Sequence, residues 1–126
     1  MISDVSAIEC LAETYFDALY LGDAERFASV FHPDARLYCN HDNEYVSMGV
    51  EEYLALVRGR ENPVDRGDRR DDRILAIIQE TPTTAVLRTR ELFLPKLFTD
   101  ELTLVKIDGQ WKIVAKVWDF EILDEG

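Results

Sequence analysis

The first half of the chain carries a helical pattern of apolar positions. From Val5 to Leu21, apolar side chains recur at three- and four-residue steps, the spacing that buries one face of an α-helix. Gly22 ends this segment, and Asp23 can cap a second, short helix. A third helical pattern follows Gly49. We therefore predict three helices in this half of the chain.

Alternating patterns rich in β-branched and aromatic residues predict the strands. Two short strands, 35–39 and 44–48, flank a polar turn over 40–43. Four further patterns follow, and only short turns separate them: Ile74–Ile78, Ala85–Leu94, Phe98–Ile107 and Trp111–Phe120. Consecutive strands with short turns form an antiparallel meander. Residues 58–73 have almost no apolar side chains, so we predict a loop there, with the charged run 65–73 as a solvated flap.

Three N-terminal helices followed by a long antiparallel sheet indicate an α+β fold in which the helices cover one sheet face. A length of 126 residues fits a single domain, 1–126, with one core. Apolar residues make up 47% and charged residues 31%, as in globular proteins. A large apolar outer sheet face seldom remains in water, so we expect a homodimer through that face.

Charge and motifs exclude several classes of partner. The net charge of -11, from 25 acidic and 14 basic residues, repels phosphate backbones, so nucleic acid is not expected. No apolar run is long enough to span a membrane and the N-terminus lacks a secretory pattern, so we expect a cytoplasmic protein. Cys10 and Cys39 are far apart, and neither His32 nor His41 has a third ligand at a metal-binding spacing. We predict reduced cysteines, no metal and no cofactor.

Two separated motifs resemble the start of nuclear-transport-factor-two-like (NTF2-like) domains. They are Y-F-D-A-L-Y-L-G-D at 15–23 and F-H-P-D-A at 31–35. F-T-D at 98–100, L-T-L at 102–104, K-I-D-G at 106–109 and W-K-I-V at 111–114, followed by Lys116-Val117, are similar more narrowly to the lumazine-binding family. The resemblance implies a cystatin-like cone with an internal pocket for a small molecule, either an aromatic or a polar heterocycle such as a pterin or lumazine.

The superfamily also contains ketosteroid isomerases, SnoaL-like polyketide cyclases, dehydratases and non-catalytic adaptors, so fold analogy does not select a reaction. We keep three hypotheses: a binding protein, a lyase, isomerase or cyclase that uses the same pocket, and a dimerisation or interaction module. By resemblance to the isomerases, Tyr15 is an oxyanion donor, Glu101 takes the second oxyanion position and Cys39 takes the position of the base. A neutral thiol cannot replace a carboxylate base near pH 7, so steroid isomerase activity is not expected.

Strand alternation places Val114, Lys116 and Trp118 on one face of the last strand, and Trp111, Ile113 and Val117 on the other. The resemblance turns the Lys116 face inward. Lys116 is then either a base or anion anchor in the pocket, or the partner of a carboxylate at the pocket rim.

Arg88 and Arg90 share one face of their strand, and an inward Arg90 can orient an anionic or heteroaromatic ligand. Glu101 is its expected cross-strand partner, and the alternative is an exposed ladder of these charges on a solvent or dimer face. The candidates for catalysis are Tyr15, His41, Glu101 and Lys116. The predicted ligand-binding residues are Tyr15, Phe31, Cys39, Tyr53, Arg88, Arg90, Glu101, Lys116 and Trp118.

Overall fold

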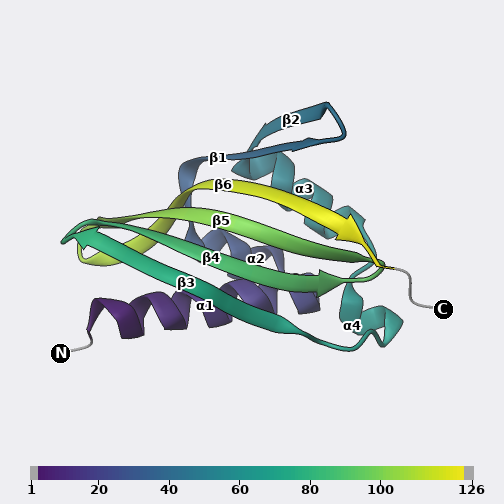
Figure 1. Cartoon of the computed structure of the whole chain (residues 1–126), viewed down its shortest axis with the longest axis horizontal. Helices are drawn as coiled ribbons and strands as arrows, with labels where there is room; N and C mark the ends of the chain where they lie inside the picture. The colour runs from purple at the N-terminus through teal and green to yellow at the C-terminus, as the bar shows by residue number, and fades with distance from the viewer. Residues whose placement is uncertain (1–2, 124–126) are drawn as a thin grey trace.

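The computed structural model describes residues 3–123, so the ends of the predicted domain 1–126 lie outside the described residues. Figure 1 shows helices on one side of a long curved sheet. The helices are α1 (Asp4–Leu21), α2 (Ala24–Val30), α3 (Val50–Gly59) and the short α4 (Pro63–Arg66). The strands are β1 (Phe31–His41), β2 (Glu44–Gly49), β3 (Asp72–Thr81), β4 (Thr84–Phe93), β5 (Lys96–Ile107) and β6 (Gln110–Ile122). The α+β prediction is confirmed.

Local chemistry explains the two N-terminal helices. The Ser3 side chain caps α1 by accepting a hydrogen bond from the Ser6 amide, and Gly22 ends it in a left-handed conformation, with φ 65°. The Asp23 carboxylate then caps α2. A Cβ atom at residue 22 would lie 2.6 Å from the Asn62 side-chain nitrogen. Glycine therefore also allows the segment before α4 to pack closely on this turn.

The six strands form one sheet in the order β2-β1-β6-β5-β4-β3. All neighbouring strands are antiparallel except β1 and β6, which are parallel. The inner face packs on α1, α2 and α3, where Ile8, Phe27, Leu37, Leu87, Leu102, Leu104 and Ile113 are fully buried. This core fixes which residues of each strand face the helices.

The predicted loop 58–73 is more ordered than its composition indicates. Asn62 caps α4. This helix has four residues, too few to show a helical pattern of apolar positions in the sequence. Arg70 Nη2 lies 2.7 Å from Asp17 Oδ1 of α1, and Tyr20 donates a 2.6 Å hydrogen bond to the Asp68 carbonyl. The charged run is therefore largely exposed but attached to α1. No helix among residues 3–123 is long and apolar enough to cross a membrane.

The prediction that Trp111 and Ile113 face away from Lys116 is wrong. Ile113 pairs with Leu104 and Ala115 pairs with Thr103, so the ladder skips Val114. This extra residue shifts the alternation by one position, as a β-bulge does. Trp111 and Ile113 are therefore buried in the same core layer as Leu104.

Candidate functional site

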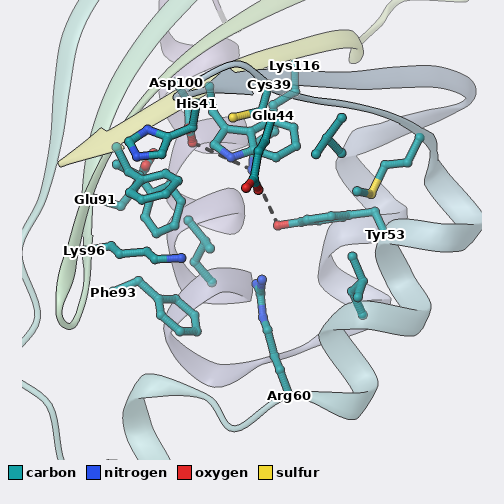
Figure 2. A pocket seen from close by; sticks show the side chains of 17 residues that line it. Cys39, His41, Glu44, Tyr53, Arg60, Glu91, Phe93, Lys96, Asp100 and Lys116 are labelled. Atoms are coloured by element: carbon teal, nitrogen blue, oxygen red, sulfur yellow. Dashed lines mark hydrogen bonds and ion pairs between the residues drawn. The ribbon is translucent and has the colours of Figure 1, made fainter. Parts of the chain in front are cut away.

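An open pocket of about 290 Å³ lies between the inner sheet face and α3. Figure 2 shows side chains from several strands and from α3 converging on it. Part of its wall is aromatic, formed by Tyr53, Phe93, Phe98, Trp118 and Phe120. The volume and the apolar walls suit a small organic molecule with a flat ring.

Buried charges gather on the inner face of three neighbouring strands. Within residues 3–123, the buried polar side chains besides tyrosine and cysteine are Thr89, Glu91, Asp100 and Lys116. Strand register explains the gathering, because Asp100 lies opposite Thr89 on β4 and opposite Trp118 on β6. Positions two residues apart share a face, so Glu91 and Lys116 join the same cluster.

Asp100 lies at the centre of this cluster. Its Oδ2 atom accepts a 2.5 Å hydrogen bond from the Tyr15 hydroxyl, which reaches it from α1. Lys116 Nζ lies 3.9 Å from the same oxygen. A buried carboxylate needs such partners because it has lost its water.

Glu91 forms an acid pair with Asp100. The pKa of Glu91 is raised well above its usual value, first by burial, then by the charge of Asp100 and a hydrogen bond between the two side chains. Thr89 donates to Glu91 Oε1, and Tyr15 donates to Asp100 Oδ2. Without a proton between them, the two remaining oxygens, Glu91 Oε2 and Asp100 Oδ1, are buried and have no hydrogen-bond partner. A proton on Glu91 Oε2 that is shared with Asp100 Oδ1 satisfies both.

Lys116 supplies the positive charge of the cluster. Its Nζ atom lies 4.9 Å from the ring centroid of Tyr53, 5.2 Å from that of Tyr15 and 5.5 Å from that of Trp118, and it donates a 3.4 Å hydrogen bond to the Tyr53 hydroxyl. Burial lowers the pKa of Lys116, but the charge of Asp100 is the main influence that offsets this, so the pKa lies above its usual value. Lys116 is therefore an ammonium group at neutral pH.

Two further side chains of the pocket come from β1. Burial raises the pKa of Cys39, so its thiol is neutral near pH 7. His41 stacks on Phe120 with ring centroids 3.9 Å apart, and its Nδ1 atom lies 2.7 Å from Asp119 Oδ1. No group of three or more His, Cys, Asp or Glu side chains within 3–123 is placed to hold a metal ion.

The comparisons with known proteins agree with this geometry. Residues 3–119 match the model of the family described as "Putative lumazine-binding". The chain belongs to this family. It is 31% identical over 118 residues to a protein named Aldolase FrzH from Cladobotryum sp, with 92% of this chain and 90% of the relative covered.

Solved structures of NTF2-like proteins share the fold of this chain. An NTF2-like protein of unknown function from Shewanella baltica superposes with a TM-score of 0.80 at 18% identity, over 96% of this chain and 98% of that one. A ketosteroid isomerase-like protein from Erwinia carotovora atroseptica gives 0.73 at 15% identity, over 95% and 98%. At these identities the likeness shows the fold alone.

The structure brings together only part of the site predicted from the sequence of this family member. Cys39, His41, Tyr53, Lys116 and Trp118 line the pocket. Tyr15 reaches the acid pair from the core below the pocket through its hydroxyl group. Phe31 is buried in the core and packs against Tyr15, Phe27 and Tyr53, so it supports the pocket from behind.

The prediction that Arg88, Arg90 and Glu101 reach the ligand is wrong. Thr89 is buried, so the residues on either side of it point to the outer face. Arg88 Nε lies 3.8 Å from Glu101 Oε1, and both side chains are about half exposed. This is the exposed ladder that the sequence left open as the alternative. Arg90 lies opposite Thr99 on the same outer face.

Sequence reasoning missed Glu91, Asp100 and Arg60 as pocket residues. One of the two acids left a signal in the sequence. Asp100 falls on the same strand face as the apolar Leu102 and Leu104, whereas Glu101 falls on the opposite face. Arg60 directly follows α3 and fell within the predicted charged loop, so no pattern distinguished it from its solvated neighbours.

Proposed function

We propose that this protein is an enzyme that removes a proton beside a carbonyl group of a small organic ligand and forms or cleaves a carbon–carbon bond there, as an aldolase does. The observation that carries the proposal is the buried acid pair of Glu91 and Asp100 in a pocket that also has aromatic walls. A buried acid with a raised pKa beside a second buried acid, as Glu91 is beside Asp100, is an arrangement found in clefts that carry out proton transfer. The 31% identity to a protein named an aldolase supports the same reaction class.

The first step is enolisation. The C–H bond beside the carbonyl breaks, its proton moves to Asp100, and its electron pair forms an enolate. The enolate oxygen accepts a hydrogen bond from the Lys116 ammonium, which donates to the Tyr53 hydroxyl and has few other competing acceptors among the surrounding aromatic rings. Glu91 holds its proton throughout and keeps the second oxygen of Asp100 oriented.

The second step joins two carbons. The enolate carbon attacks the carbonyl carbon of an aldehyde, a C–C bond forms, and the new alkoxide takes the proton back from Asp100. Atoms and electrons balance without an oxidant or reductant, and the reverse sequence cleaves the bond. A Schiff-base route through Lys116 is disfavoured, because an amine nucleophile requires a lowered pKa and that of Lys116 is raised.

A coupling assay tests this function without knowledge of the natural substrate. Acetone and benzaldehyde are incubated with the protein, and 4-hydroxy-4-phenylbutan-2-one is separated on a chiral column. We expect an enantiomeric excess with the wild type and a racemic background with Asp100→Asn. Asp108→Asn, in the exposed turn between β5 and β6, is the matched control and should behave as the wild type does. A racemic product from the wild type contradicts the proposal.

The second candidate function is binding of a heterocycle without turnover. The aromatic walls favour it, since Trp118, Phe93 and Phe120 offer flat surfaces to a pterin- or lumazine-like ring. Calorimetric titration with lumazine separates the two candidates. Binding of lumazine together with a racemic coupling product favours the binding protein, and an enantiomeric excess favours the enzyme.

A further inference from the structure

Arg60 has two buried donors without a partner at the pocket. Arg60 is the C-cap of α3, and its backbone amide donates a 3.1 Å hydrogen bond to the Leu56 carbonyl. Figure 2 shows the side chain rising from the end of α3 toward the pocket interior. The Nε and Nη2 atoms are buried and have no hydrogen-bond acceptor. Most buried polar groups are hydrogen-bonded, so two unpartnered donors on one side chain are unusual.

These two atoms form one edge of the guanidinium group. Their N–H bonds point in the same direction, which is the geometry that engages a carboxylate with two parallel hydrogen bonds. Arg66 uses the same edge in this molecule, because its Nε and Nη2 atoms lie 2.9 Å and 2.5 Å from Asp68 Oδ2. No acid of the described chain occupies the corresponding position at Arg60.

Two aromatic rings hold the Arg60 guanidinium in place. Its Cζ atom lies 4.8 Å from the ring centroid of Phe93 and 5.7 Å from that of Tyr53. Such contacts stabilise the cation without a hydrogen bond, and the Nε and Nη2 donors keep no acceptor. The other two cations of the pocket each have a neighbour in the structure, because Lys116 Nζ lies 3.9 Å from Asp100 Oδ2 and Lys96 Nζ lies 4.3 Å from the Phe120 ring centroid.

We propose that the Nε–Nη2 edge of Arg60 binds a carboxylate of the ligand, so the pocket selects planar aromatic carboxylates. The carboxylate lies at the α3 end and the ring between the aromatic walls, which directs the opposite end of the ligand toward Asp100. The substrate class that follows is an aromatic carboxylate that also carries a carbonyl group. This last step rests on the proposed function, whereas the anchoring of the carboxylate does not.

Binding of 2-naphthoate and its neutral carboxamide, 2-naphthamide, tests the anchor by calorimetry. These two compounds have no enolisable hydrogen, so they report on Arg60 and not on catalysis. We expect the wild type to bind the naphthoate about 10- to 100-fold more tightly than the amide, as two hydrogen bonds to a charged group allow. Arg60→Gln should abolish the preference. Arg60→Lys should restore it only in part, because it keeps the charge without the paired edge.

Arg58→Gln is the matched control, since Arg58 lies on the same helix, is exposed and faces Glu25 at 3.6 Å. It removes the same charge and should leave the preference unchanged. Equal affinities for the two compounds in the wild type, absence of binding to both, or a preference that survives Arg60→Gln would overturn the proposal.

An NMR measurement on the wild type does not depend on how the variants fold. The Nε–Hε signal of Arg60, assigned by its loss in Arg60→Lys, should shift when 2-naphthoate is added and not when 2-naphthamide is added. An Arg60 signal that does not respond to the naphthoate overturns the anchor. If the Arg60 signal shifts but the coupling product is racemic, the anchor is retained and the aldolase function is rejected. If the signal does not shift but the product has an enantiomeric excess, the function is retained and the anchor is rejected.

Discussion

Tyr15 and Asp100, which are 85 positions apart in the sequence, form a 2.5 Å hydrogen bond below the pocket. The bond links α1 to the middle of β5, so the first helix contributes directly to the electrostatics of the candidate site. Burial, followed by the charges of Asp100 and Glu91, raises the pKa of Tyr15 well above its usual value. The hydroxyl therefore remains a hydrogen-bond donor at neutral pH.

Tyr15→Phe should lower the free energy of unfolding by about 1.5 to 3 kcal/mol, because a buried acceptor loses a hydrogen bond to a charged group. Urea denaturation at pH 7 measures the change. Tyr45→Phe removes a hydroxyl from an exposed residue and is the control. A Tyr15→Phe protein within about 0.5 kcal/mol of the wild type, the range of surface substitutions, contradicts the burial argument.

Glu91→Gln should change how stability depends on pH. A raised pKa in the folded state means that Glu91 keeps its proton where the unfolded chain has lost it. The stability that it contributes is therefore complete below the usual pKa of a glutamate and declines as the pH rises toward the folded pKa. Above pH 5, the free energy of unfolding of the wild type should therefore fall relative to that of Glu91→Gln. The change should be up to about 1.4 kcal/mol for each pH unit.

Urea denaturation of both proteins at pH 5, 6, 7 and 8 gives this difference directly. Glu121→Gln removes one exposed carboxylate and is the matched control. If the difference in the free energy of unfolding stays constant from pH 5 to pH 8, Glu91 is ionised in the folded protein. The hypothesis of a shared proton is then rejected.

The fold was predictable from the sequence to the level of its elements because periodicity is a local property. The positions of α1 and of the four long strands follow from apolar spacing alone. Strand faces were less predictable, since one bulge at Val114 reverses the alternation of everything before it. To predict the acid pair, one needs the register between β4 and β5. To predict Arg60, one needs the path by which a charged segment returns to the pocket. Neither can be read from the local sequence.

The two tryptophans should report differently on the pocket. Trp118 lines it, whereas Trp111 lies beneath the start of α1 and donates a 3.2 Å hydrogen bond from Nε1 to Asp4 Oδ1. We expect 4-nitrobenzoate to quench the fluorescence of the wild type and of Trp111→Phe. Trp118→Phe should lose the response. Quenching that disappears in Trp111→Phe and persists in Trp118→Phe would place the ligand elsewhere.

The outer sheet face remains our predicted dimer interface. Ile78 and Val117 are exposed on it, beside the Arg88 and Glu101 pair. Val117→Glu should convert a dimer to a monomer in light scattering at tens of micromolar. Val5→Glu, at an equally exposed position on α1, should not. A monomeric wild type at that concentration contradicts this prediction.

Deuterium exchange tests the central claim, proton transfer by the Asp100 cluster, most directly. Acetophenone is incubated in D₂O with wild type, Asp100→Asn or the Asp108→Asn control, and the loss of its methyl proton signal is followed by NMR. We predict that the wild type and the control accelerate exchange over buffer, and that Asp100→Asn lowers the accelerated rate by about 100- to 10,000-fold, the usual worth of a general base. Exchange by Asp100→Asn at the wild-type rate would contradict the account.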